Sequence, residues 1–190
     1  GGDVAEDVER ATATVVEGAA PASRRSPAPF PVRVAVALAL GLAAVIVIAD
    51  QLTKAAITAR YGPCGTPGFH PVFGRHAGFS YVCNTGTAFS GFQDTPLVWL
   101  LVLIAVAAVL WLWLRSLAAP RPLQQVAFGL ILGGAAGNLI DRVRFGYVVD
   151  FVDLRLNDSL RWWVFNVADA AICIGVGLLV AALWRDAPRT

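Results

Sequence analysis

Residues 34–54 read VAVALALGLAAVIVIADQLTK, and this stretch decides the fold class. Its first part, up to Ala49, carries no charge, and Asp50 and Lys54 follow at its end. About 20 predominantly apolar residues are enough for a helix to cross the hydrocarbon core of a bilayer. The stretch therefore predicts a transmembrane helix over roughly 32–57 that ends in two ionisable side chains.

Three further apolar stretches of similar length are bounded by charged residues, at 96–114, 123–140 and 163–184. Tryptophans flank them, as is typical of membrane–water interfaces. The sequence thus predicts an all-α membrane protein with four transmembrane helices, which places both termini on the same side. Lys and Arg are nearly balanced between the two faces, so the positive-inside rule leaves the orientation open.

The composition of the 190 residues supports a membrane protein. Hydrophobic residues make up 57% of the chain and charged residues 15%, against about 25% charged in soluble domains. A soluble protein of this size has too small a core to bury so much apolar surface. The net charge of +2 is too small to indicate a nucleic-acid partner.

The segments outside the spans differ in character. Residues 1–30 are rich in acidic residues, then in Pro, Ala and Arg, and predict a disordered tail ahead of one domain at 31–186. The loop 60–95 has strand-like composition at 78–82 and predicts a small β-rich element on the membrane. The loop 144–162 mixes Phe, Val and Trp with charged residues and predicts a short interfacial helix.

Ionisable side chains at the ends of spans are functional candidates, because each costs about 2.5–3.5 kcal/mol to insert into lipid. They lie toward one face of the predicted membrane domain: Asp50, Lys54, Asp141, Arg142 and Asp169. Asp150 lies in the adjoining loop. Polar groups that converge from separate helices predict one site.

Spacing suggests how some of these groups act. Asp50 and Lys54 are four residues apart and share a helix face. A role in the functional site and a simple ion pair at the end of the helix explain this spacing equally well. Asn138 and Arg142 have the same spacing. Arg142 is suited to hold a substrate carbonyl, a partner carboxylate or a lipid phosphate.

Asp169 precedes a long apolar run, where a lone carboxylate is costly unless it is protonated, hydrogen-bonded or paired. Asn166 is expected on the same helix face. A second carboxylate nearby would split the two titrations, so that one group activates a water while the other protonates a carbonyl. Asp150 is the natural partner, and Asp141 is the competitor.

Other chemistries have less support. The chain has two His, three scattered Cys and no phosphate-binding glycine motif, so we expect no metal and no cofactor. Cys64 and Cys83 share a loop, and whether they pair stays open. A transporter subunit or an assembly scaffold would show an internal repeat or a polar stripe along a whole span, and the sequence shows neither. An enzyme that transfers groups to lipid head groups usually needs a His, Ser or Cys nucleophile or a set of metal-binding carboxylates, and paired Asp residues with asparagines fit proteolysis better. An inactive homologue stays open.

Five blocks in order resemble the lipoprotein signal peptidases, or signal peptidase II, of bacteria. They are 50–54 (D-x-x-[ST]-K), 84–90 (N-x-G-x-A-F-S), 133–142 (G-G-x-x-G-N-x-x-D-R), 146–151 (G-x-V-V-D-F) and 165–169 (F-N-x-A-D). The resemblance covers about 30–186, and five ordered blocks are very specific.

The resemblance implies a membrane aspartyl endopeptidase whose catalytic dyad is Asp150 and Asp169. It implies that the other matched residues bind substrate or support the site: Asp50, Lys54, Asn84, Gly86, Asn138, Asp141, Arg142 and Asn166. The implied substrate is a diacylglyceryl-modified prolipoprotein, cut before the lipid-bearing Cys of the lipobox. No metal or organic cofactor is implied.

The resemblance also implies a location. We expect a multi-pass protein of the bacterial cytoplasmic (inner) membrane, with both termini cytoplasmic and the active site at the extracytoplasmic face. Membrane lipid is an expected partner besides the substrate, the enzyme is expected to be a monomer, and inhibition by globomycin is expected.

Overall fold

The computed structural model describes residues 30–62, 68–86, 96–157 and 162–186. Its helices are α2 (Val32–Tyr61), α3 (Pro96–Ser116), α4 (Pro122–Phe145) and α5 (Val167–Asp186). All four are long and apolar enough to cross a membrane. Strands β1 (His70–Phe73), β2 (Ala77–Asn84) and β3 (Val148–Leu154) form an antiparallel sheet in the order β1-β2-β3. The predicted four-helix membrane fold with a small β-rich element is confirmed.

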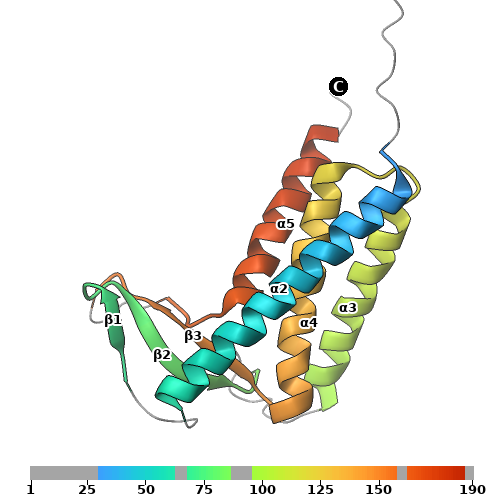
Figure 1. Cartoon of the computed structure of the whole chain (residues 1–190). Coiled ribbons are helices and arrows are strands. Elements are labelled where there is room, and N and C mark those ends of the chain that lie inside the picture. The colour runs from blue at the N-terminus through green and yellow to red at the C-terminus, as the bar shows by residue number, and fades with distance from the viewer. Residues whose placement is uncertain (1–29, 63–67, 87–95, 158–161, 187–190) are drawn as a thin grey trace, which may run out of the picture.

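The four helices form a bundle in which α4 packs against α2, α3 and α5. The sheet projects sideways from one end of this bundle (Figure 1). At the opposite end lie the start of α2, the turn between α3 and α4, and the end of α5. The first and last spans therefore begin and finish on the same side, as four crossings require.

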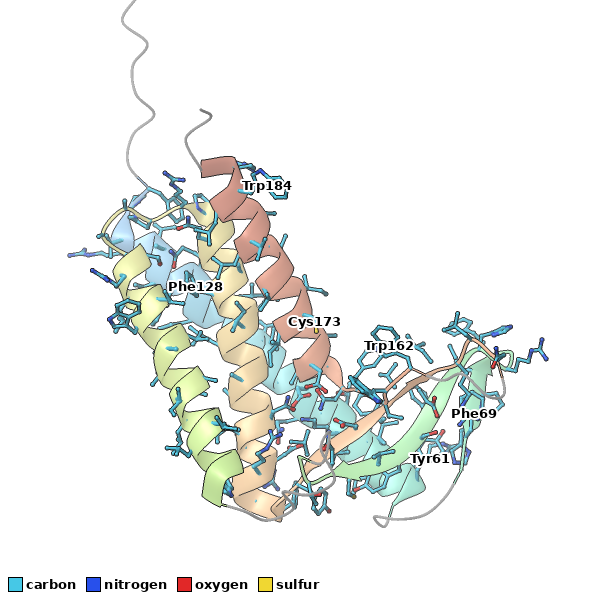
Figure 2. The ribbon with its side chains drawn as sticks, turned by 180° about the vertical axis from the view of Figure 1, so that it is seen from behind. Tyr61, Phe69, Phe128, Trp162, Cys173 and Trp184 are labelled. Atoms are coloured by element: carbon cyan, nitrogen blue, oxygen red, sulfur yellow. The ribbon has the colours of Figure 1, made fainter. Side chains whose placement is uncertain are left out.

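Aromatic residues mark both ends of the bundle. Trp184 lies near the end of α5 and Trp162 lies beside the sheet (Figure 2), with 78% and 63% of their surfaces exposed. Large aliphatic side chains between these levels also point outward, such as Leu103 and Val180. Apolar surface bounded by tryptophans at two levels is what a membrane-spanning bundle presents to lipid.

Glycines allow α4 to approach its neighbours closely. A Cβ atom on Gly129 or Gly133 would lie 2.8 Å from a carbonyl oxygen of α2. A Cβ atom on Gly134 would meet the backbone of Ala168 in α5. Small residues at helix contacts are a common basis of packing in membranes, where burial from water supplies no driving force.

We expect Gly133→Ala to destabilise the bundle by about 1–3 kcal/mol, because the added methyl group pushes α2 away from α4. Gly41→Ala is the matched control, since it replaces a helical glycine with open space around its Cβ position. That control should cost nothing and gain up to about 1 kcal/mol in helix propensity. Thermal unfolding in one detergent measures both, and equal midpoints would contradict the packing argument.

Strand β3 occupies the loop in which a short interfacial helix was predicted. That prediction is wrong for residues 146–157 and 162, and the rest of the loop lies outside the described residues. The backbone groups of β3 pair along β2, with Val82 opposite Asp150. Three β-branched residues, Val148, Val149 and Val152, suit this pairing.

Helix α5 begins at Val167, four residues later than predicted. Phe165 is held in the sheet instead, because its N–H donates to the carbonyl of Val152 (3.1 Å) and its carbonyl accepts from the N–H of Val152 (2.8 Å). Asn166 therefore lies directly before the helix, not on its face.

Two predictions fall largely outside the described residues. The tail 1–30 is described only at its last residue, and the division of the chain at residue 30 stays a prediction. Cys64, which the sequence offers as a partner of Cys83, also lies outside the described residues.

Candidate active site

A cluster of polar side chains lies where α2, α4, β3 and the start of α5 meet, at the end of the bundle that carries the sheet (Figure 2). Its buried members are Asp50, Lys54, Asn138, Asp141, Asp150 and Asn166. Asp169 lies beside them and is partly exposed. Within the described part of the chain, every buried side-chain nitrogen and oxygen has a hydrogen-bond partner. The predicted convergence of polar groups at one end of the spans is thus observed.

Lys54 lies between two buried carboxylates. Its Nζ is 2.8 Å from Asp50 Oδ2 and 2.9 Å from Asp141 Oδ2, and it donates to Asn138 Oδ1 at 3.1 Å. These contacts use all three N–H donors of the ammonium group. Such saturation is what allows a charged cluster to be stable away from water. No group of three or more His, Cys, Asp or Glu residues in the described ranges is arranged to hold a metal ion.

The start of α5 is fixed by side chains of the cluster. Asn166 Oδ1 accepts from the backbone N–H of Asp169 (2.8 Å), and Asp169 Oδ2 accepts from the backbone N–H of Asn166 (3.3 Å). This reciprocal pair is a capping box. Asp50 Oδ1 reaches across from α2 and accepts from the N–H of Ala168 at 3.0 Å. The negative charges lie at the positive end of the helix dipole, which stabilises them.

Asp150 is buried, with 2% of its surface exposed, and accepts two side-chain hydrogen bonds. Asn166 Nδ2 donates to its Oδ1 at 2.7 Å, and Asn84 Nδ2 donates to its Oδ2 at 2.9 Å. Burial raises the pKa of Asp150 to about 6. The hydrogen bond from Asn84 lowers this pKa, and the negative charge of Asp169 raises it further. This carboxyl group therefore exchanges its proton near neutral pH.

Asp169 also accepts two N–H groups. Asn138 Nδ2 donates to its Oδ1 at 2.7 Å, in addition to the backbone contact from Asn166. Asn166 thus bridges Asp150 and Asp169, by its side chain and its backbone respectively. The competing partner, Asp141, faces Lys54 instead and accepts from the N–H of Val149 at 3.0 Å.

A tight turn orients Asn84. Its Oδ1 accepts from the N–H of Gly86 at 2.9 Å, which leaves its Nδ2 directed at Asp150. Gly86 has a φ of 93°, a backbone conformation that residues with a Cβ atom rarely adopt. The glycine therefore supports the asparagine that contacts Asp150.

The family described as Signal peptidase (SPase) II matches residues 42–185. This chain belongs to the signal peptidase II family.

Relatives and solved structures extend the match. The lipoprotein signal peptidase of Moorella thermoacetica is 44% identical over 137 residues, covering 72% of this chain and 86% of the relative. That of Syntrophotalea carbinolica is 41% identical over 152 residues, covering 76% and 89%. A bacterial membrane enzyme solved by the in meso method at 1.9 Å resolution superposes with a TM-score of 0.67 at 29% identity, covering 84% of this chain and 97% of that one.

As a signal peptidase II, the chain is a membrane-embedded aspartic endopeptidase of the bacterial inner membrane that removes lipoprotein signal peptides. Asp150 and Asp169 accept hydrogen bonds from the same residue, Asn166, at the end of the bundle that carries the sheet. A pair of carboxyl groups suits the chemistry of an aspartic peptidase.

All ten predicted site residues of this signal peptidase II lie in or beside the cluster. Arg142 has the loosest contact, since its Nη1 donates to the carbonyl of Asn138 at 3.4 Å. Its charge nevertheless interacts with those of Asp169, Asp150 and Asp141. Arg142 is thus a cation close enough to interact with both members of the aspartate pair.

Sequence reasoning missed Gln51. Its Nε2 lies 2.9 Å from Asp141 Oδ1, 3.2 Å from Asp50 Oδ2 and 3.3 Å from the carbonyl of Gly137. Gln51 directly follows Asp50 and precedes Lys54 by three residues in the first block. A neutral polar side chain at the end of an otherwise apolar span was the available signal.

Proposed function

We propose that Asp150 and Asp169 are the catalytic dyad, and that they hydrolyse the peptide bond before the lipid-bearing Cys of a diacylglyceryl-modified prolipoprotein. The observation that carries the proposal is the bridge through Asn166, which contacts both carboxyl groups. The negative charge of Asp169 also raises the pKa of Asp150, and two carboxyl groups coupled in this way titrate as a pair, so that one can be acidic while the other is basic. That combination is what amide hydrolysis without a covalent intermediate requires.

The chemistry balances with one proton on the dyad. We assign this proton to Asp150, whose pKa is raised, and the basic role to Asp169. Asp169 takes a proton from water as the water oxygen attacks the scissile carbonyl carbon, and Asp150 gives its proton to the carbonyl oxygen. The resulting gem-diol collapses with cleavage of the C–N bond. The leaving nitrogen takes the proton from Asp169, and the gem-diol returns one to Asp150.

The surrounding residues have supporting roles in this proposal. Asn84, Asn138 and Asn166 hold the dyad by N–H donation, and Gly86 orients Asn84. Arg142 stabilises the negative charge that develops on the substrate carbonyl, as preorganised positive groups do in such sites. The ion cluster behind the dyad, formed by Asp50, Lys54 and Asp141, braces these elements.

The position of the site explains why the peptidase is embedded in the membrane. A peptide reaches the dyad from the aqueous side, while the acyl chains of the modified Cys stay in lipid along the apolar helices. We propose that the sheet end of the bundle is extracytoplasmic and that both termini are cytoplasmic. We also propose a monomer in contact with membrane lipid, inhibited by globomycin.

Substrate lipidation is the first test of this function. The purified chain is incubated in detergent with a diacylglyceryl-modified prolipoprotein and with its unlipidated twin, and the products are identified by mass spectrometry. We expect cleavage of the lipidated protein alone, with the modified Cys as the new N-terminal residue. Equal cleavage of both proteins, or a cut at another bond, would contradict the proposal.

The raised pKa of Asp150 predicts the pH dependence of cleavage. The group holds its proton below about pH 6 and loses it above, so kcat/KM should fall as the pH rises through that value. Asn84 favours the ionised form by donating to Asp150, so Asn84→Ala should move this decline to higher pH. An initial-rate series between pH 4 and pH 9 measures both profiles, and an unmoved decline in the variant would count against Asp150 as the titrating group.

A further inference from the structure

Each aspartate of the proposed dyad is preceded by a residue whose backbone N–H is held by a buried carboxylate. The N–H of Val149, before Asp150, donates to Asp141 Oδ2 at 3.0 Å. The N–H of Ala168, before Asp169, donates to Asp50 Oδ1 at 3.0 Å. The two catalytic elements, β3 and α5, are therefore each fixed one residue away from the reacting group.

The same two carboxylates are joined to each other by two side chains from one turn of α2. Lys54 Nζ lies 2.8 Å from Asp50 and 2.9 Å from Asp141. Gln51 Nε2 lies 3.2 Å from Asp50 and 2.9 Å from Asp141. We call the group of Asp50, Gln51, Lys54 and Asp141 the clamp.

We propose that the clamp sets the separation of Asp150 and Asp169, and that Gln51 is a positioning residue for catalysis within it. This inference rests on the proposed function of the two aspartates. It connects them by a continuous path of contacts, from Val149 through Asp141, the two bridging side chains and Asp50 to Ala168. A change anywhere on this path moves one aspartate relative to the other, and misplacement by about 1 Å costs up to about 100-fold in rate.

Gly137 supports this inference from the side of α4. A Cβ atom at this position would lie 2.6 Å from Asp50 Oδ2, so only glycine leaves room for the carboxylate. The carbonyl of Gly137 is also a third acceptor for Gln51, at 3.3 Å. The backbone of α4 is thus shaped around the clamp.

Gln51→Leu tests the inference without changing any charge. The charged groups that face the dyad stay in place, namely Asp50 and Lys54 from α2 and Asp141 and Arg142 from α4. We expect kcat to fall about tenfold with KM within about twofold, because binding is kept while the reacting groups are misplaced. Weaker coupling of the two carboxyl groups should also move the alkaline decline of kcat/KM to lower pH, opposite to the change expected for Asn84→Ala.

Gln125→Leu is the matched control. Gln125 is likewise a glutamine of a spanning helix with side-chain partners; it is buried, accepts from Trp113 Nε1 at 2.9 Å and donates to Ser116 Oγ at 3.0 Å. It precedes Asn138 by 13 residues on α4, or about 20 Å. We expect a lowered melting temperature with kcat and the pH profile unchanged.

The outcomes are separable. A folded Gln51→Leu variant with wild-type kcat and pH profile would overturn the inference, and so would parallel losses of activity and melting temperature in both glutamine variants. If Gln51→Leu does not fold, Gly137→Ala keeps every donor and should give the same downward shift of the pH profile; no shift would overturn the inference. Full activity of Asp150→Asn or Asp169→Asn would instead refute the proposed function itself.

Discussion

Asp150→Asn and Asp169→Asn should each abolish cleavage of a lipidated prolipoprotein, with kcat reduced on the order of 10⁴-fold or more. The substitutions keep the size of the side chain but remove the group that exchanges a proton. Either change leaves the dyad without an acid or without a base, so the losses should be of similar size. Quantified gel-shift time courses with enzyme in excess over substrate measure the residual rate.

Asp153→Asn is the matched control for this pair. Asp153 is a buried aspartate of the same strand as Asp150, but it accepts from Ser80 at 2.6 Å and pairs with Arg155 at 2.8 Å, within the sheet. Its replacement should weaken the sheet and leave cleavage by the folded protein near the wild-type rate. A variant of Asp150 or Asp169 as active as that of Asp153 would show that the dyad is misassigned.

Lys54→Met should cause the largest loss of stability among these variants, by about 3–5 kcal/mol. Asp50 and Asp141, both buried, would lose the cation between them, and Asn138 Oδ1 would lose one of its two donors, keeping only Asn166 Nδ2. Cleavage should fall with it, because the dyad is supported from this side. Unfolding of both proteins in the same detergent gives the difference in stability.

The double variant Lys54→Met/Asp50→Asn tests the electrostatic cause of that loss. It restores the net charge of the ion cluster, so part of the stability should return while cleavage stays low. An unfolding midpoint of Lys54→Met equal to that of the wild type would contradict the account of the cluster.

Much of the fold could be predicted because its main features are local in sequence. The length of the apolar run before Asp50 defines a span, and the charged residues beyond Ile140 mark where another ends. The same locality made most of the site predictable, because ionisable groups in lipid are costly and their clustering at one end has few structural explanations.

The remaining features depend on contacts between distant segments. Strand β3 forms because β2 offers an edge to it, and Phe165 is drawn into that sheet, which delays the start of α5. Gln51 contacts Asp141 across 90 residues of sequence, and its local signal, a polar side chain at the end of an apolar span, is shared with residues that only face the lipid head groups. Asn166 was predicted only in part: the sequence identified it as a site residue, but not its position directly before the helix.

The most direct test of the account is one cleavage assay of a diacylglyceryl-modified prolipoprotein by the wild type, Asp141→Asn, Asp150→Asn and Asp169→Asn, in the same detergent. Asp141 is the carboxylate that the sequence alone left in competition, and the structure places it against Lys54. We predict cleavage by the wild type, slower but measurable cleavage by Asp141→Asn, and none by the other two variants. Cleavage by Asp150→Asn or Asp169→Asn at the rate of the wild type would contradict the account.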